Sequence, residues 1–416
     1  MEKLLHYIWH HRLWTHLQFV TEGHESVEVI DVGTYNSHAG PDFFNAKVKI
    51  DGQLWAGSIE IHINSSDWYR HHHDTDKKYN NVVLHVVQHI DRQVFTQDKR
   101  ELPQVVLTVP DYVKENYEAL LKTEFYPPCY RIIPQLSQLY VHSWMNALTV
   151  ERLMRKTQRI QSVLNSVNGD WERTFFVTLA RNVGFGVNSD VFERWARELD
   201  LVKVGHHRDN LLQVEAFFLG TAGLLEENAI PAHYRDTHYY NIREEFRFLQ
   251  TKFHLQPMND ASWKYLRMRP GNFPHVRLLQ LAKVYSEQKL SFNDLLETHG
   301  AKGFRALLKK SGFTSANLLI INTIVPVLFA YGSLHHDEAL CDEAYHLLEE
   351  LRYERNYITQ IWQTVGLRAE NAADSQALLE LRLNYCDKRD CLRCRFGAEF
   401  MRTTQKVYHQ SCQSLS

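Results

Sequence analysis

Three polar residues of the N-terminal region, Asp42, Glu60 and His62, have the types and spacing of a divalent-metal site. The stretch AGPDFFNAKVKIDGQLWAGSIEIHINSSDW (residues 39–68) alternates apolar and polar residues on either side of an Asp-Gly turn signal, which predicts a β-hairpin. Asp42 would stand at the start of the first strand. Glu60 and His62 would share the polar face of the second, because successive side chains point to opposite faces. A solvated strand face is the ordinary alternative.

Carboxylates on adjacent strands can supply the oxygen ligands that hard cations prefer, so Asp42 and Glu60 predict a site for Mg²⁺ or Mn²⁺. Such an ion polarises a phosphodiester and lowers the pKa of a bound water. His62 would orient that water or stabilise the negative charge that develops. These three residues are therefore the predicted catalytic residues, and the two carboxylates are the predicted metal ligands.

Three further residues could assist this site. Asp67 and His73 belong to the polar segment SSDWYRHHHDTD, which leaves the end of the strand that carries Glu60. A run of histidines in a loop is commonly solvated, but this position allows one of them to reach the metal, and we favour His73. His85 interrupts the apolar strand VVLHVVQHI, where a histidine is more often a hydrogen-bonded core residue than a ligand.

Three cysteines near the C-terminus predict a second metal site of another kind. Cys386, Cys391 and Cys394 have the spacing C-x4-C-x2-C, and a CxxC step lets two thiolates hold one metal from a tight turn. His409 or Cys412 would be the fourth ligand. Zinc is the simpler choice and an iron–sulfur cluster is the alternative, since three ligands do not decide between them. Otherwise these are three thiols in a basic loop.

A basic stripe predicts a nucleic-acid partner, either DNA or RNA. Its members fall at the i, i+3, i+4 and i+7 positions of a predicted helix, so they share one face: Arg152, Arg155, Lys156 and Arg159. Such a stripe can equally be a solvated helix face. The formal net charge of −2 excludes a broadly basic nucleic-acid-binding surface, so any such binding would use a local patch.

The elements that would position these residues change in character near residue 130. Before it we predict a helix, three strands, a short helix or loop, and a buried strand. The proline-rich stretch FYPPCYRIIP marks a junction, and helical periodicity predominates beyond it. We therefore predict an α+β protein: an α/β domain with a mixed sheet at residues 1–128, a mainly helical domain at 129–380, and a cysteine-containing segment at 381–416.

The N-terminal region resembles the PD-(D/E)XK nuclease core. Pro41 and Asp42 match the first half of its motif, Glu60 matches the acidic position of the second half, and the element order over residues 1–110 is similar. The resemblance implies metal-dependent cleavage of phosphodiesters. This family usually carries a lysine where the present chain has His62, and a neutral histidine would stabilise the transition-state charge less than a lysine.

Nearly the whole chain is similar to a bacterial family known as domain of unknown function 2851. The stretches that carry the similarity are GPDFFNAKVKIDG, GSIEIHINSSDW, YNNVVLHVV, RPGNFPHVRLLQLA and YCDKRDCLRCRFG. This resemblance implies a family and no reaction.

A metal-dependent nucleic-acid phosphodiester hydrolase is the function that these observations favour. The alternatives are a non-catalytic nucleic-acid- or partner-binding protein on a degenerate nuclease core, and a small-molecule hydrolase whose zinc is held by histidines. The chain lacks a signal-peptide pattern, and its longest apolar run, Leu318–Ala330, is too short to cross a bilayer. We therefore expect a cytoplasmic protein without a membrane partner. No feature of the sequence predicts an oligomeric state.

Overall fold

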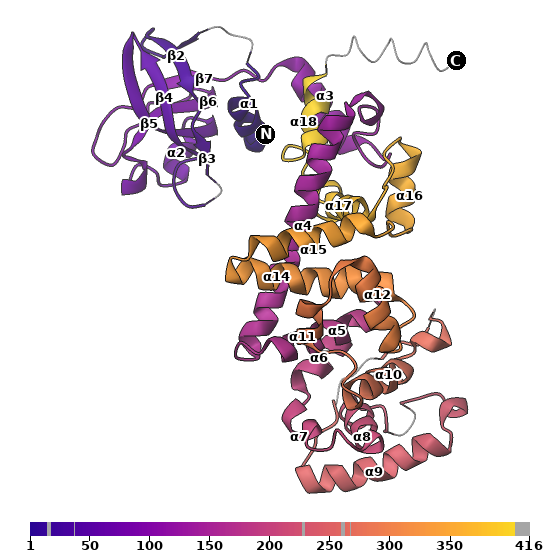
Figure 1. Ribbon diagram of the computed structural model, residues 1–416. Coiled ribbons are helices and arrows are strands. Elements are labelled where there is room, and N and C mark those ends of the chain that lie inside the picture. The colour runs from indigo at the N-terminus through magenta and orange to yellow at the C-terminus, as the bar shows by residue number, and fades with distance from the viewer. Residues whose placement is uncertain (15–17, 37, 227–228, 259–262, 267, 404–416) are drawn as a thin grey trace. The chain divides into compact units, whose positions relative to one another are not determined.

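The structure is a computed structural model that describes residues 1–14, 18–36, 38–226, 229–258, 263–266 and 268–403 (Figure 1). The chain divides into two compact units. Unit 1 contains Met1–Gln135 together with Asn384–Ser416, and unit 2 contains Leu136–Leu383. The predicted boundary at residue 128 lies close to the end of the first part of unit 1. The cysteine-containing segment, predicted as a separate piece, instead groups with unit 1 from Asn384 onward.

Unit 1 is built on a mixed sheet with the strand order β1-β2-β4-β5-β6-β7, in which β3 also pairs with β4. The pairs from β1 to β5 are antiparallel, whereas β5–β6 and β6–β7 are parallel. The strands are β1 (Phe19–Val20), β2 (Ser26–Asp31), β3 (Thr34–Tyr35), β4 (Phe43–Ile50), β5 (Gln53–Asn64), β6 (Val82–His89) and β7 (Gln104–Val106).

The predicted hairpin is the pair β4–β5. Asp51 and Gly52 in its turn have φ values of 46° and 82°, the left-handed conformations that this residue pair tolerates. Ile59 is fully buried on one face of β5. On the other face Glu60 is 5% exposed and His62 is 1% exposed, so the polar face is buried and not solvated. Helices α1 and α2 both pack against β5, and they place the polar residues inside unit 1.

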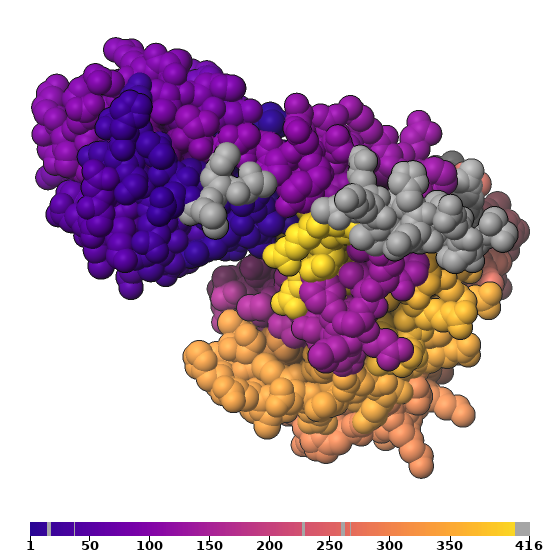
Figure 2. Space-filling view, turned by 90° about the horizontal axis from the view of Figure 1, so that it is seen from above, coloured from indigo at the N-terminus to yellow at the C-terminus, as the bar shows by residue number. Residues whose placement is uncertain are grey.

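The helices of unit 1 come from both ends of the chain. They are α1 (Glu2–His10), α2 (Asp67–Arg70), α3 (Asp111–Lys122) and α18 (Arg395–Arg402), with the 3-10 turns η1 (Lys77–Tyr79) and η2 (Ile133–Gln135). Figures 1 and 2 show the yellow C-terminal residues of α18 beside the purple residues of the segment that follows the sheet, and α3 and α18 pack together. The C-terminal segment therefore completes the fold of unit 1.

Unit 2 is helical, with its helices distributed along its whole length. They are α4 (Gln138–Ser166), α5 (Trp171–Val183), α6 (Ser189–Glu198), α7 (Leu201–Gly205), α8 (Leu211–Thr221), α9 (Thr237–Phe253), α10 (Pro274–Ser286), α11 (Phe292–Glu297), α12 (Gly300–Lys310), α13 (Ala316–Leu319), α14 (Val325–His335), α15 (Glu338–Glu350), α16 (Tyr357–Thr364) and α17 (Ala372–Glu380). Shorter helical turns are η3 (Ala232–Tyr234), η4 (Pro270–Asn272) and the π-helix η5 (Ile320–Ile324), while the π-helix η6 (Leu381–Cys386) continues from α17 into unit 1.

Local sequence sets where these helices begin. The Asp170 side chain accepts from the N–H of Arg173 at the start of α5, and Ser291 with Asp294 forms a capping box at the start of α11. Large apolar side chains such as Phe217 and Phe304 then form one continuous core in unit 2. The mixed sheet in unit 1 and the helices elsewhere confirm the predicted α+β class.

One apolar helix of unit 2 is longer than its sequence pattern indicated. Ala316–His335 runs through α13, η5 and α14, and within the described part of the chain it is long and apolar enough to cross a membrane by length and composition. It extends the run Leu318–Ala330 that we had judged too short, but 61% of its most apolar window is buried, as in the core helix of a folded domain. The cytoplasmic location and the lack of a membrane partner stay predictions.

Candidate functional site

The two predicted metal-binding carboxylates lie side by side, Asp42 directly before β4 and Glu60 on the antiparallel neighbour β5. The N–H of Asp42, the residue before β4, donates to Glu60 Oε2 at 3.0 Å. In return the N–H of Ile61 donates to Asp42 Oδ2 at 2.9 Å. These reciprocal hydrogen bonds hold both carboxylates at one point of the sheet. The Asp42 side chain is 20% exposed and that of Glu60 is 6% exposed, so solvent reaches the pair from the Asp42 side.

Negative charge is costly at this point. Burial, followed by the neighbouring charge of Asp42, raises the pKa of Glu60 to about 9. Burial also raises the pKa of Asp42, although the nearby His6 and the Ile61 N–H oppose this effect. Two adjacent buried carboxylates share a proton or a cation in preference to ionising separately. A bound divalent ion would remove this cost.

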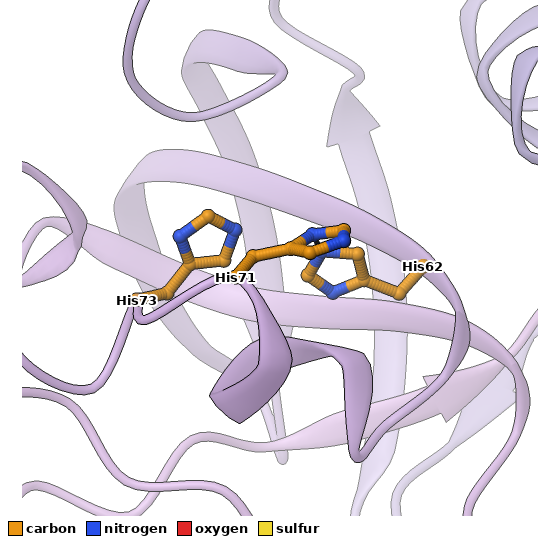
Figure 3. Close-up of side chains that lie close together, drawn as sticks. All are labelled: His62, His71 and His73. Carbon is orange, nitrogen blue, oxygen red and sulfur yellow. Dashed lines mark hydrogen bonds between the residues drawn. The ribbon is translucent and has the colours of Figure 1, made fainter.

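Three imidazoles lie close together (Figure 3), and two of them, those of His62 and His73, face Glu60. His62 comes from β5, while His71 and His73 come from the turn after α2, and one ring nitrogen of each lies within 4.8 Å of the other two. His62 Nε2 is 3.1 Å from His71 Nδ1. Between His71 and His73 in the chain, His72 has a left-handed φ of 59° and is exposed. This tight turn brings two histidines of the HHH run back towards β5.

Two buried imidazole nitrogens face the carboxylates without making a hydrogen bond. His73 Nε2 is 3.1 Å from Glu60 Oε1, and His6 Nε2, from α1, is 3.3 Å from Asp42 Oδ2. Neither nitrogen has a hydrogen-bond partner among the described residues. Buried polar atoms are seldom left unpaired in folded proteins. Imidazole nitrogens this close to carboxylate oxygens fit a centre that takes a cation or a proton between them.

A chain of hydrogen bonds behind His62 assigns its tautomer. The Gln104 amide nitrogen donates to the Arg92 carbonyl at 3.0 Å, which leaves Gln104 Oε1 facing His85 Nδ1, 3.3 Å away. This oxygen can only accept, so His85 Nδ1–H is the hydrogen-bond donor. His85 Nε2 then accepts from His62 Nδ1 at 2.9 Å. His62 is left with an unprotonated Nε2, as a metal ligand requires. Burial, followed by the surrounding histidines, lowers the pKa of His62 to about 2, so its ring is neutral.

The three residues predicted to assist the site differ in whether they lie in the imidazole group. His73 belongs to the group, with a pKa lowered to about 4 by burial and by His71. His85 is a fully buried hydrogen-bonded core residue that supports His62, which was the ordinary alternative. Asp67 is not brought into the group, because its Oδ1 pairs with Arg70 at 2.9 Å and its Oδ2 accepts from the N–H of Asn64 at 3.2 Å. Its carboxylate stabilises α2 instead.

The sequence interpretation missed three residues that the structure brings to this site. His71 belonged to the recognised HHH run and is exposed like His72, but the turn geometry brings only the His71 ring to His62. His6 comes from α1, 36 positions before Asp42, and its lone place in a helix pattern gave no signal. Gln104 on β7 is 3% exposed, and a buried glutamine in a short strand is the one feature that could have drawn attention to it.

The predicted nucleic-acid-binding residues all lie on α4: Arg152, Arg155, Lys156 and Arg159. Their polar groups are engaged inside unit 2. Arg152 and Arg155 pair with the fully buried Glu380, and Arg159 pairs with Glu193. Lys156 is partly buried and donates to Gln376 Oε1 at 3.0 Å. A phosphate would have to displace these carboxylates, so nucleic-acid binding at this stripe stays a prediction.

The three predicted thiolate ligands lie in unit 1. Cys386 ends η6, Cys391 lies in the following turn, and Cys394 is the N-cap residue of α18. All three are buried, and burial raises the pKa of Cys391 to about 12. The two residues named as a possible fourth ligand, His409 and Cys412, lie outside the described residues.

Comparison with known proteins gives a family for this chain. Residues 2–313 and 307–357 match the family described as "Protein of unknown function (DUF2851)". No curated protein and no solved structure matches the chain. Because the matched residues cover most of its length, the chain belongs to the DUF2851 family, as its sequence resemblance predicted.

Proposed function

We propose that unit 1 is a metal-dependent hydrolase that cleaves phosphodiester bonds of nucleic acid. One observation carries the proposal: the unprotonated Nε2 of His62 faces Glu60 Oε1 at 3.6 Å. His73 Nε2 approaches the same oxygen at 3.1 Å, and burial raises the pKa of Glu60 to about 9, so without a metal this carboxyl group holds a proton near neutral pH. A divalent cation among these atoms would displace that proton and be coordinated by the carboxylate and the imidazoles.

The donor set favours Mn²⁺ or Zn²⁺. The two carboxylates alone led to the expectation of Mg²⁺ or Mn²⁺, since oxygen ligands suit these hard ions. The imidazoles of His62, His71 and His73 add nitrogen donors, which suit zinc and other transition metals better than magnesium. Manganese accepts both kinds of ligand, so it is the metal to test first.

Each residue of the site would have its own role in hydrolysis. A bound ion would polarise a phosphoryl oxygen and lower the pKa of a water at the site. Asp42 is the partly exposed carboxylate that water and substrate can reach, and it would accept the proton of the attacking water. His62 would be a ligand, held in its tautomer by His85 and Gln104. His6, beside Asp42 Oδ2, would keep that carboxylate in place.

The substrate class rests on the arrangement of the sheet. The chain order α1, β2, β4, β5, α2 and β6 is the order expected for a PD-(D/E)XK nuclease core, apart from the two-residue strands β1 and β3. Asp42 and Glu60, the two acidic motif positions, meet on adjacent strands. This agreement between motif position and geometry supports nucleic acid as the substrate.

A second candidate is a zinc-dependent hydrolase of small molecules. The close group of His62, His71 and His73 favours it, because three imidazoles and an open position form a common catalytic zinc site. Glu60 would then be the general base next to the zinc. The two candidates share the metal centre and differ in the substrate that reaches it.

The experiment compares the wild type with Glu60→Gln and with Glu28→Gln as the matched control. Glu28 lies on β2 in the same sheet, and its side chain is 59% exposed. Each protein would be assayed with Mn²⁺, Zn²⁺ or Mg²⁺ on single-stranded and double-stranded DNA and RNA, and on a small chromogenic phosphodiester and carboxylic ester. Glutamine keeps the shape of Glu60 and removes the charge that the metal needs, so we expect a loss of about 100-fold or more in kcat/KM.

Three outcomes separate the candidates. Metal-dependent cleavage of a nucleic acid that Glu60→Gln abolishes and Glu28→Gln retains supports the proposal. Activity on the small ester alone supports the zinc hydrolase of small molecules. Wild type and Glu60→Gln that are equally inactive on every substrate would overturn both and leave the non-catalytic binding protein.

A further inference from the structure

Four buried cysteines of unit 1 form a second cluster outside the site described above. Three are the C-terminal Cys386, Cys391 and Cys394, and the fourth is Cys129, in the proline-rich segment between α3 and η2. They are 5–7% exposed, and none forms a disulfide bond. Each C-terminal thiol acts electrostatically on Cys129, and together with burial this raises the pKa of Cys129. A side-chain hydrogen bond between Cys386 and Tyr126, three residues before Cys129, joins the C-terminal cysteines to the segment that carries Cys129.

Hydrogen bonds join the two segments that carry these cysteines. The Arg389 guanidinium, between Cys386 and Cys391, donates to the carbonyls of Leu120 at 3.0 Å and Thr123 at 2.9 Å. These contacts fix the C-terminal cysteine loop against the end of α3, a few residues before Cys129. The loop is thus held in place by contacts that do not involve sulfur.

Helix α18 closes the cluster from the other side. Asn116 on α3 donates to the carbonyl of Phe400 at 3.2 Å and to that of Thr403 at 2.8 Å. A Cβ at Gly397 would lie 2.1 Å from the carbonyl oxygen of Cys391, so α18 packs directly on the cysteine loop. Figure 1 shows α18 alongside α3, far from it in sequence. The cysteines therefore lie between packed segments of unit 1 and not in an open loop.

We propose that Cys129, Cys386, Cys391 and Cys394 bind an iron–sulfur cluster. The C-x4-C-x2-C spacing is that of the three close ligands in plant-type [2Fe–2S] clusters, in which the distant fourth cysteine follows the run, whereas here Cys129 precedes it. On binding, each thiol releases its proton to solvent and forms one Fe–S bond, while iron and sulfide arrive with the cluster. Cys129 replaces His409 and Cys412 as the fourth ligand.

The surroundings suit a negatively charged centre. The same loop carries the cations Lys388, Arg389, Arg393 and Arg395. Helix α18 begins at Cys394 as its N-cap residue, and the positive end of a helix dipole favours a thiolate there. A single zinc ion could use the same four sulfurs, but structural zinc sites commonly pair two close-spaced ligand steps, whereas this chain has one CxxC step. The spacing therefore favours the cluster.

The place of the ligands in the chain gives the cluster a structural role. Cys129 lies just before the chain leaves unit 1 after Gln135, and Cys386 lies just after it returns at Asn384. The cluster would tie these two segments together within unit 1. This inference does not depend on the proposed hydrolase activity, because none of its ligands belongs to the histidine and carboxylate group.

The test begins with the full-length wild type, purified under nitrogen without chelator. We expect about two iron atoms and two acid-labile sulfide ions per chain, as in a [2Fe–2S] cluster, with visible thiolate-to-iron absorption that dithionite bleaches. Protein that contains zinc and no iron, or no metal at all, overturns the proposal. This measurement on the wild type decides the question even if a cysteine variant fails to fold.

Two variants then identify the fourth ligand. Cys129→Ser should lose roughly tenfold or more of its iron and sulfide, whereas the matched control Cys341→Ser, on α15 of unit 2, should keep both. Wild-type iron content in a folded Cys129→Ser protein overturns the proposed ligand set. Glu60→Gln should keep the cluster, so failure of the hydrolase proposal and failure of this one are distinguishable.

Discussion

His62 occupies the position where the resembled nucleases usually carry a lysine, and its neighbours determine what it can do there. A lysine would bring a positive charge to the transition state. The neutral His62 instead presents an unprotonated Nε2, because His85 and Gln104 fix its tautomer. Under the proposed function, a histidine at this position would supply a metal ligand in place of a positive charge.

We predict that His62→Lys lowers the affinity for Mn²⁺ or Zn²⁺ by about 10- to 100-fold or more. A protonated ammonium cannot coordinate a metal, and the hydrogen bond to His85 is lost as well. Isothermal titration of metal-free protein measures this affinity, with His72→Lys, on the exposed residue of the same turn, as the control. Unchanged metal affinity together with higher activity would mean that His62 stands in for the family's lysine and is not a ligand.

Lys156 on α4 is the residue whose burial has the clearest consequence for pH. Burial, followed by the charge of Arg152, lowers its pKa from 10.5 to about 7, although Glu354 and Glu380 oppose the shift. Between these two values the unfolded chain binds a proton that the folded chain does not. Stability therefore rises with pH in that window.

We predict that the free energy of unfolding increases from pH 7 to pH 9, by at most about 1.4 kcal/mol per pH unit from this group. Lys156→Met should flatten this rise, because methionine fills a similar volume and does not titrate. Urea unfolding at a series of pH values measures the slope, and Lys310→Met, at an exposed position of α12, is the control. The same slope in wild type and Lys156→Met would contradict the prediction.

At the scale of elements, the parallel pairing of β5 with β6 depends on one glycine. A Cβ at Gly57 would lie 2.4 Å from Val83 Cγ1 and 2.6 Å from the carbonyl oxygen of Asn81. That oxygen cannot easily move, because it accepts the N–H of Ser58 at 2.9 Å. The close approach holds β5 in the register that places Glu60 opposite His85.

Gly57→Ala should lower the free energy of unfolding by about 1–3 kcal/mol, the usual cost of an extra methyl group in a packed site. The midpoint of urea unfolding measures this change. The control is Gly271→Ala, where a Cβ would meet no atom within 4 Å. Equal stability of Gly57→Ala and the wild type would mean that β6 can shift to accept the methyl group.

At the scale of the whole molecule, every proposed metal ligand lies in unit 1. The histidine and carboxylate group is on β4, β5 and the turn after α2, and the cysteines lie in the two segments next to unit 2 in the chain. Unit 2 has its own continuous apolar core. Metal binding energy should therefore stabilise unit 1 directly.

We predict that chelation of the bound metals speeds amide hydrogen exchange in residues 111–135 and 384–403 and in the turn at 66–76. Exchange in residues 136–383 should change little, because none of its residues is a proposed ligand. Hydrogen exchange read by mass spectrometry, before and after removal of metal, measures this difference. A similar increase throughout unit 2 would contradict the assignment of the metals to unit 1 alone.

Local periodicity was enough to predict several parts of this protein. Alternation and the Asp-Gly turn predicted the β4–β5 hairpin, and period-3.6 spacing predicted the helical majority. Placing Asp42 and Glu60 on adjacent strands also followed from local pattern, because the turn fixes the register of a hairpin. The C-x4-C-x2-C spacing needed no structure at all.

The residues that join these local patterns from distant parts of the chain became apparent from the folded structure. His6 meets Asp42, Gln104 supports His62 through His85, and Cys129 joins cysteines more than 250 positions away. Periodicity tells which face an element buries but not what covers that face. The polar face of β5 is buried because helices and the histidine turn pack on it, and the basic stripe of α4 is paired because acidic residues from other helices reach it. Such contacts form between elements, so no single segment of the sequence encodes them.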